Sequence, residues 1–155
     1  MENPFMARAI ALALDNVQTA RGGPFATVIA RGADVLAEGT NQVTANNDPT
    51  AHAEVVAIRA ACQRLRDFRL TGCDVYTTCE PCPMCLGALY WSRADRVYFA
   101  SRREDAAAAG FDDAFLYREL LLPMEERKLA MIPLMRAEAA AVFEAWNRSA
   151  DRISY

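Results

Sequence analysis

The sequence predicts an α/β protein: a three-layer α/β/α sandwich around a mixed five-stranded sheet. Short apolar runs of strand length alternate with segments whose apolar residues recur at helical spacing. The chain has 155 residues, 53% hydrophobic and 24% charged, which is enough to bury one core without cross-links. No repeat, low-complexity tract or linker interrupts it. We therefore expect a single domain over residues 1–155.

The first part of the chain predicts a helix followed by a hairpin. Asn3 and Pro4 have the residue types of an N-cap and a first helical position. Apolar residues then recur every three to four positions as far as Gly22. Two apolar runs follow, at residues 25–30 and 35–37, and the polar turn between them predicts that they pair as a hairpin.

The rest of the chain alternates between helices and strands. In order, we expect a helix over residues 50–65 that starts at Asp48-Pro49, a strand over 75–77, a helix from Pro83 to Trp91, a strand over 96–100, a helix over 111–121, a strand over 131–134, and a last helix with Ala139, Val142, Phe143 and Trp146 on one face. Helices separate the last three strands, so these strands should be parallel, with helices on both faces of the sheet.

Composition argues against nucleic-acid and membrane partners. The net charge is −3, and the longest basic cluster, Arg102-Arg103, is followed at once by two acidic residues, as expected for a solvated surface. No apolar run approaches the roughly 18 residues that span a bilayer. The first residues lack the pattern of a secretory signal, which predicts a cytoplasmic location.

The cysteines favour a metal site over disulfides. The chain has five of them, an odd number, and three lie between Cys79 and Cys85. In a reducing compartment this is a poor disulfide framework. Metal binding or catalysis is therefore the better explanation for the cluster.

Two short motifs carry the strongest chemical signal. One contains His52 and Glu54, and the other contains Cys82 and Cys85 within Pro-Cys-Pro-Met-Cys. One imidazole and two thiolates give Zn²⁺ three ligands and leave a fourth position for water, as in catalytic rather than structural sites. Glu54, two residues from the histidine, could reach that water as an acid/base group. This combination of motifs is typical of zinc deaminases.

The position of these residues supports the same interpretation. Both motifs fall at the start of predicted helices, where the positive helix end favours thiolate over thiol. Cys82 and Cys85 are three residues apart, so one helical turn can direct both sulfurs at one ion.

A structural zinc knot is the main alternative. It would combine Cys79, Cys82 and Cys85 with Cys62 or Cys73, at a spacing that fits no common zinc ribbon. It would also leave the only histidine and its neighbouring glutamate without a role. We instead expect Cys62, Cys73 and Cys79 to be ordinary core thiols.

The chain resembles the cytidine-deaminase-like superfamily and, within it, the small zinc-dependent guanine deaminases of bacteria. The resemblance rests on Gly22-Gly23-Pro24-Phe25, Asn41, residues 47–54, residues 79–88, Tyr90-Trp91, Asp105-Ala106-Ala107, Gly110-Phe111-Asp112-Asp113 and Tyr155. The metal motif is common to the superfamily, whereas the Gly-Phe-Asp-Asp segment and the aromatic C-terminus indicate guanine. Ala26 departs from the pattern, since related sequences often have glycine there.

This resemblance implies an activity and a set of roles. The activity is hydrolysis of guanine to xanthine and ammonia with one Zn²⁺ per subunit and Glu54 as the proton shuttle. A carboxylate of the Gly-Phe-Asp-Asp segment, for which Asp113 is the better match than Asp112, would protonate the leaving amine. The implied substrate-binding residues are Phe25, Asn41, Ala53, Trp91, Asp112 and Tyr155. The resemblance also implies a homodimer that exchanges its C-terminal segment, about residues 137–155, so that Tyr155 covers the base in the partner's site.

The residues alone leave several of these roles open. Asn41 offers a donor and an acceptor to a purine edge, but it could equally be a turn residue. Phe25 could stack on a base, or it could be a core residue at the start of a strand. Trp91, at the end of a predicted helix, could likewise be a binding residue or a core residue. Without the resemblance, Asp112 and Asp113 would be interpreted as N-cap residues of a helix at the protein surface.

Other functions also remain open. Guanosine, ammeline or cytosine could replace guanine as the substrate. A tRNA-editing adenosine deaminase shares the metal motif but should carry a basic groove for phosphates, and the predicted isoelectric point near 5.2 argues against one. A zinc-stabilised binding or assembly protein is the non-enzymatic alternative, and the presence of Glu54 argues against it.

Overall fold

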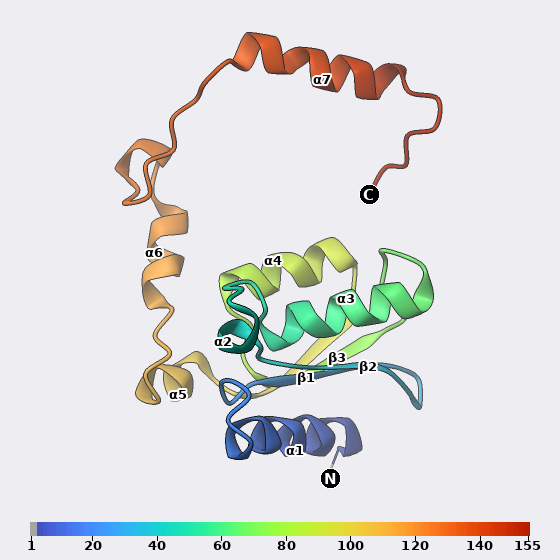
Figure 1. Ribbon diagram of the computed structural model, residues 1–155, viewed down its shortest axis with the longest axis vertical. Helices are drawn as coiled ribbons and strands as arrows, with labels where there is room; N and C mark the ends of the chain where they lie inside the picture. The colour runs from blue at the N-terminus through green and yellow to red at the C-terminus, as the bar shows by residue number, and fades with distance from the viewer. Residues whose placement is uncertain (1–2) are drawn as a thin grey trace. The chain divides into compact units, whose positions relative to one another are not determined.

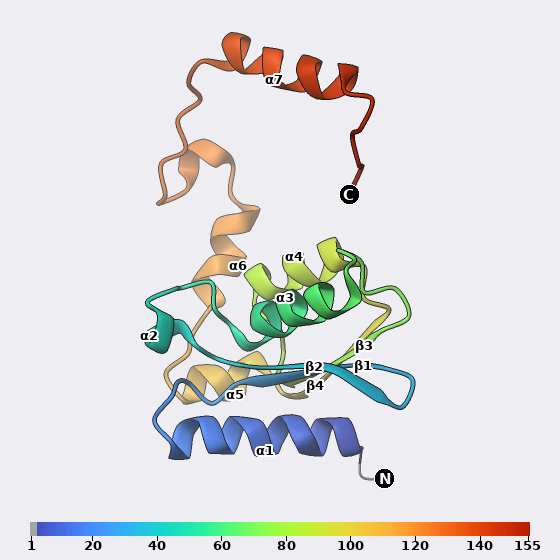
Figure 2. The same ribbon diagram turned by 45° about the vertical axis from the view of Figure 1, so that its right-hand side comes forward.

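The first unit of the protein is a four-stranded sheet covered by helices on both faces. The computed structural model describes residues 3–155, which divide into two compact units, residues 3–113 and 114–155. The sheet contains β1 (Ala26–Arg31), β2 (Asp34–Thr40), β3 (Asp74–Cys79) and β4 (Arg96–Ser101) in the order β2-β1-β3-β4. Helix α1 (Pro4–Gln18) lies on one face, and α3 (Ala53–Leu65) and α4 (Pro83–Ser92) lie on the other (Figures 1 and 2).

The predicted α1 and hairpin are confirmed. The side chain of Asn3 caps α1 by accepting hydrogen bonds from the amides of Phe5 and Met6, both at 3.0 Å. Strands β1 and β2 pair as an antiparallel hairpin, with Ala26 opposite Thr40. Strand β1 also pairs antiparallel with β3, whereas β3 and β4 are parallel, so the sheet is mixed as predicted.

The sheet has four strands, and the prediction of five was wrong. The predicted fifth strand, residues 131–134, has no regular secondary structure and is exposed throughout. An apolar run has the composition of a strand, but it becomes one only when a neighbouring strand supplies ladder hydrogen bonds. Consequently β4 is the edge of the sheet within this chain.

Helix α3 begins later than predicted. Residues 48–50 form a turn in which the Asp48 carboxylate accepts hydrogen bonds from the amide and the hydroxyl of Thr50, at 2.8 and 2.7 Å. The turn residues satisfy one another, and the helix starts at Ala53 with His52 as its N-cap. The helix therefore starts about one helical turn after Asp48-Pro49, and the start predicted there was wrong.

Two short helices were not predicted from the sequence. They are α2 (Val43–Asn46) after β2 and α5 (Arg103–Ala108) after β4. Both are too short for an apolar period to be recognised. The Asp105 carboxylate accepts a hydrogen bond from the Arg102 amide at 2.8 Å, which stabilises the start of α5.

The core lies between the sheet and the α3/α4 layer. Ile29, Leu70 and Val75 are fully buried there, together with small residues on the inner face of α3. A smaller cluster between the sheet and α1 contains Val28 and Tyr76. These two packed layers hold the ends of α3 and α4 in place, and the metal motifs lie at those ends.

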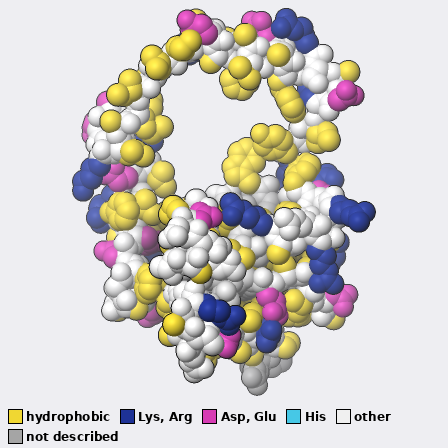
Figure 3. Space-filling model, viewed as in Figure 1, with side chains coloured by type: hydrophobic (Ala, Val, Ile, Leu, Met, Phe, Trp, Pro, Cys, Tyr) yellow, Lys and Arg dark blue, Asp and Glu magenta, His cyan; other side chains and the backbone are white. Residues whose placement is uncertain are grey.

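The second unit consists of α6 (Ala114–Leu121), a 3₁₀ turn (Met124–Glu126) and α7 (Arg136–Arg148). The helix predicted over residues 111–121 therefore begins three residues late, after Gly110, whose φ is +92°. None of the residues from 114 to 155 is buried. Hydrophobic side chains are visible on the surface along α7 (Figure 3). None of the described helices is both long and apolar enough to cross a membrane.

Candidate metal centre and active site

Three side chains from two helix starts converge on one point. The Nδ1 atom of His52 lies 3.6 Å from the Cys82 sulfur and 3.5 Å from the Cys85 sulfur. All three ligand atoms lie within 4.8 Å of one another, and within residues 3–155 no fourth histidine, cysteine or carboxylate joins the group. His52 and Cys82 are the N-caps of α3 and α4, so the positive ends of both helices face this point.

The spacing of these atoms fits a tetrahedral zinc ion. Bonds of about 2.3 Å to sulfur and 2.0–2.1 Å to nitrogen at a tetrahedral angle place a sulfur and a nitrogen about 3.5 Å apart. The two observed nitrogen–sulfur distances, 3.5 and 3.6 Å, match that value. One imidazole, two thiols and no fourth protein ligand in the described chain are also the donor set of a catalytic zinc site. The predicted ligands His52, Cys82 and Cys85 therefore suit Zn²⁺.

The pKa values of the two cysteine thiols are shifted in opposite directions. A hydrogen bond from the Cys85 thiol lowers the pKa of Cys82 to about 4, and His52 contributes in the same direction. The same contact with Cys82, together with burial, raises the pKa of Cys85 far above its usual range. A dication would take the place of that proton and stabilise both sulfurs as thiolates.

Glu54 lies beside the metal ligands and is shielded from solvent. Its side chain is buried in the first turn of α3, and burial raises the pKa of its carboxyl group. It also makes a hydrogen bond with Cys85. A buried carboxyl group with a raised pKa can both accept and return a proton near neutral pH.

A glycine in β2 allows α3 to come this close to the sheet. A Cβ atom on Gly39 would lie 2.4 Å from the Ala53 carbonyl oxygen and 2.6 Å from the Ala57 nitrogen. Any larger residue would push the start of α3 away from β2 and displace His52 and Glu54. Ala53 itself is fully buried at this contact.

The predicted recognition residues Phe25 and Asn41 are neighbours. Phe25 immediately precedes β1 and Asn41 immediately follows β2, and the backbone amide of Asn41 donates to the Phe25 carbonyl at 3.0 Å. The next amide, that of Gln42, donates to the Ala51 carbonyl at 2.9 Å, which ties this corner to the residue before His52. The Oδ1 atom of Asn41 accepts a long hydrogen bond of 3.3 Å from the Val43 amide. Its Nδ2 group makes no hydrogen bond within the described residues.

The Gly-Phe-Asp-Asp segment is held near the same corner. The rings of Phe111 and Phe25 meet edge to face, with centroids 5.0 Å apart and an interplanar angle of 84°. Burial and, to a smaller extent, the charge of Cys82 raise the pKa of Asp113. Asp112 is exposed.

Two predicted site residues lie apart from the ligands in the chain. Trp91 is 68% exposed near the far end of α4, nine residues after Cys82 or about 13 Å along a helix. Tyr155 ends the second unit and is 72% exposed. The substrate-binding roles of Trp91, Asp112 and Tyr155 stay predictions.

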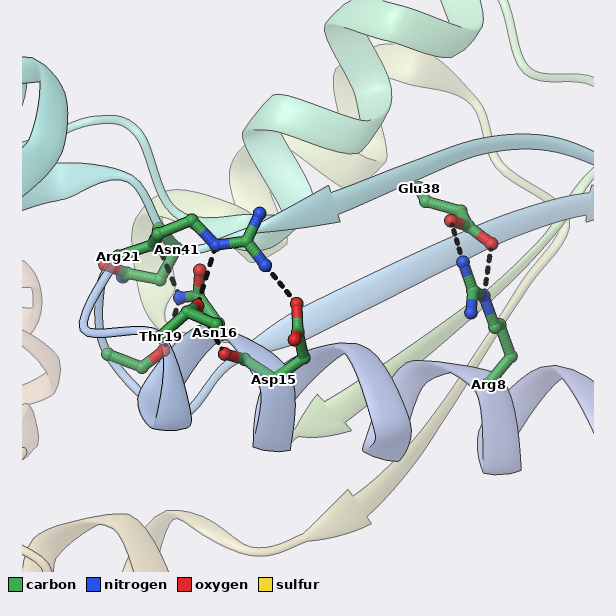
Figure 4. A network of polar contacts seen from close by, with 8 residues as sticks. Arg8, Asp15, Asn16, Thr19, Arg21, Glu38 and Asn41 are labelled. Atoms are coloured by element: carbon green, nitrogen blue, oxygen red, sulfur yellow. Dashed lines mark hydrogen bonds and ion pairs between the residues drawn. The ribbon is translucent and has the colours of Figure 1, made fainter.

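One residue at this corner was missed in the sequence. Asn16 on α1 is buried, and its Nδ2 group donates to the carbonyls of Gly23 and Asn41, at 2.9 and 3.1 Å (Figure 4). An asparagine within an otherwise helical pattern gives no signal of this role. The sequence indicates only that Asn16 lies on the same side of α1 as Ala9 and Ala13, the side that is buried.

The comparison with protein families agrees with this geometry. Residues 1–101 match the family described as the cytidine and deoxycytidylate deaminase zinc-binding region. The chain belongs to this family. The family match spans all three residues that suit zinc, and it makes zinc the metal of this deaminase fold.

Individual relatives extend the similarity beyond the metal motifs. This deaminase is 48% identical over 151 residues to the guanine deaminase of Bacillus subtilis (strain 168), which covers 97% of each chain. It matches the X-ray structure of guanine deaminase from Bacillus subtilis with a TM-score of 0.96 and 47% identity, over 100% of this chain and 99% of that one. It is 42% identical to the tRNA-specific adenosine deaminase of Aquifex aeolicus, but over 78 residues only, 50% of this chain and 52% of that protein.

Proposed function

We propose that the protein is a guanine deaminase that hydrolyses guanine to xanthine and ammonia. The observation that carries the proposal is the buried Glu54 beside a three-ligand zinc site, in a chain similar to a guanine deaminase over nearly its whole length. Similarity to tRNA-specific adenosine deaminases is weaker, at 42% identity over 50% of the chain for one relative and 31% over 77% for another. It therefore gives less support to an RNA substrate.

His52, Cys82 and Cys85 would hold the zinc. When bound, zinc supplies the Lewis acidity that lets a water molecule lose a proton near neutral pH. Glu54 would accept this proton and deliver it to the ring nitrogen beside the carbon under attack, where negative charge develops. Because Glu54 is shielded from bulk water, the proton passes to the substrate rather than to solvent.

Release of ammonia requires a second proton. The exocyclic amine leaves as the carbon–nitrogen bond breaks, and the oxygen of water remains on the ring carbon as the new carbonyl of xanthine. Asp113 would donate to the departing nitrogen, because its segment is held against Phe25 at the corner beside the ligands. Asp112 is the exposed neighbour and the weaker candidate.

The base would be recognised at the corner where β1 begins and β2 ends. Phe25 offers a half-buried ring for stacking. The Asn41 Nδ2 group would donate to an acceptor on the purine edge, since its Oδ1 atom already accepts from Val43. Ala53, whose buried backbone packs against Gly39 of β2, immediately precedes Glu54 and would line the site beside it.

We also propose that the active enzyme is a homodimer that exchanges C-terminal segments, with Tyr155 over the partner's bound base. The support is twofold. Residues 114–155 bury no side chain of their own. The edge strand β4 exposes Tyr98 and Phe99, and residues 131–134 have the composition of a strand that would extend such an edge.

A substrate panel tests the proposed activity directly. Purified zinc-loaded protein is incubated with guanine, guanosine, ammeline, cytosine and adenine, and ammonia release is measured beside zinc content. We expect guanine to give the highest kcat/KM, with xanthine as the product. A higher value for any other compound would replace guanine as the substrate, and no ammonia from any of them at full zinc content would contradict the proposal.

A further inference from the structure

Asn16 occupies a position where an apolar residue would be expected. Helix α1 turns Ala9, Ala13 and Asn16 toward the sheet, and Asn16 is 1% exposed. Burying an amide costs free energy unless it is hydrogen-bonded. Its Nδ2 group meets this cost with two bonds, to the Gly23 carbonyl at 2.9 Å and the Asn41 carbonyl at 3.1 Å (Figure 4).

These two carbonyls belong to the segments that carry the proposed recognition residues. Gly23 is two residues before Phe25, and its carbonyl also accepts from the Phe25 amide at 2.9 Å. The backbone N–H of Asn41 donates to the Phe25 carbonyl, and the backbone carbonyl of Asn41 accepts from the Asn16 side chain. The backbone of Asn41 is therefore held on both sides. One buried side chain thus connects both segments.

Gly22 shows how closely these segments approach. A Cβ atom on Gly22 would lie 2.1 Å from the Asn41 carbonyl oxygen and 3.0 Å from the Asn16 Nδ2 atom. The chain therefore has no room for a side chain between Gly22 and Asn41.

We infer that Asn16 is a positioning residue for substrate recognition, which holds the Asn41 backbone so that its side-chain amide faces the base. This inference rests on the proposed function, because it takes the role of Asn41 from there. Asn16 does not touch the substrate. It acts by limiting the motion of the corner at which β1 begins and β2 ends.

The test compares Asn16→Ala with a matched exposed control, Gln18→Ala, on the same helix. Asn16→Ala removes both hydrogen bonds, each worth about 1 kcal/mol in a typical protein. We expect the KM for guanine to rise roughly three- to tenfold, with kcat changed by less than about twofold and zinc content unchanged. Gln18→Ala should leave KM as in the wild type.

A double-mutant cycle separates positioning from plain stability. If Asn16 acts through the Asn41 side chain, adding Asn16→Ala to Asn41→Ala raises KM by less than about twofold, because nothing remains to be positioned. Independent, additive effects would overturn the inference, as would a lowered melting temperature with an unchanged KM. If Asn16→Ala does not fold, Asn16→Ser is judged by the same criteria, since it shortens the side chain and breaks at least one bond.

A second readout does not depend on turnover. The Asn41 amide proton, bonded to Phe25, should exchange with solvent faster in Asn16→Ala than in the wild type, measured by NMR, while amides in the middle of β3 keep their rates. Unchanged exchange at Asn41 would overturn the inference even if the protein proved inactive on guanine. Inactivity of the wild type together with faster exchange would instead reject the proposed function and leave the positioning role intact.

Discussion

The two units of the chain differ in how they use apolar residues. The first unit buries large side chains such as Ile29 and Val75 between a sheet and its helices. The second unit buries none: Phe143 on α7 is 71% exposed, Ile132 83% and Leu134 83%. Both units have similar hydrophobic residue types, but among the described residues only those of the first unit form buried clusters.

The contrast separates the part that holds the chemistry from the part that needs a partner. The metal ligands and Glu54 all belong to the first unit and are placed by its core, so zinc binding should depend on that unit alone. An exposed apolar surface of this extent marks an interaction site. The second unit is therefore the part through which assembly and closure of the site would occur.

The largest effect should come from a change inside the first unit. Glu54→Gln keeps the size of the side chain but removes its ability to carry a proton. We expect kcat to fall by about 10²- to 10⁴-fold while zinc remains at one per chain, measured by steady-state ammonia release and metal analysis. Near-normal turnover would show that proton transfer does not pass through Glu54.

The metal site could be predicted from the sequence because it depends on short local patterns. The prolines and the three-residue spacing of Cys82 and Cys85 place both sulfurs on one helical turn, and His52 and Glu54 lie two residues apart. The α/β class and the four strands of the sheet were predicted for a similar reason, since each is a local apolar run between turn signals.

The features that were missed or wrong depend on contacts between distant segments. Nothing local marks Asn16 or Gly39, whose roles come from the close approach of α1 and α3 to the ends of β1 and β2. The fifth strand was wrong because composition alone does not supply a neighbouring strand. Sequence patterns record what a segment favours, whereas these features depend on what packs against it.

The exposed face of α7 provides the next test. Val142, Phe143 and Trp146 lie on one side of the helix. Phe143→Ser should weaken self-association by roughly ten- to a hundredfold, measured by sedimentation across a range of protein concentrations. Ala141→Ser, on the opposite side of the same helix, is the control and should leave the dimer intact. An unchanged dimer in Phe143→Ser would remove α7 from the interface.

The end of the chain should matter less than the catalytic glutamate. Removal of residues 151–155 deletes Tyr155 and should lower kcat/KM for guanine roughly tenfold, because the base is no longer covered, while zinc stays bound. Asp151→Asn, in the same tail, serves as the control for general disturbance. Full activity in the shortened protein would exclude a role for Tyr155.

The smallest effect is expected at a surface ion pair far from the chemistry. Arg8 on α1 donates two hydrogen bonds to Glu38 on β2, at 2.8 and 2.9 Å (Figure 4). The hydrogen bonds from Arg8 lower the pKa of Glu38 below its ordinary value of 4.5. The pair therefore stabilises the fold above that pH, and the stabilisation is lost as the pH falls through the lowered pKa.

Arg8→Ala should accordingly cause a small fall in melting temperature at pH 7 that disappears toward acid pH, with kcat and KM unchanged. Glu38→Gln and the double variant Arg8→Ala/Glu38→Gln complete a double-mutant cycle. A melting temperature that differs equally at all pH values would show that Arg8 contributes by packing rather than by its charge.

X-ray absorption at the zinc edge of the purified protein tests the central claim most directly. The account predicts one zinc per chain with two sulfur ligands at about 2.3 Å and nitrogen or oxygen in the other positions. Four sulfur ligands would show a structural knot that draws in other cysteines, and a protein that binds no zinc at all would have no catalytic metal; either result would contradict the account.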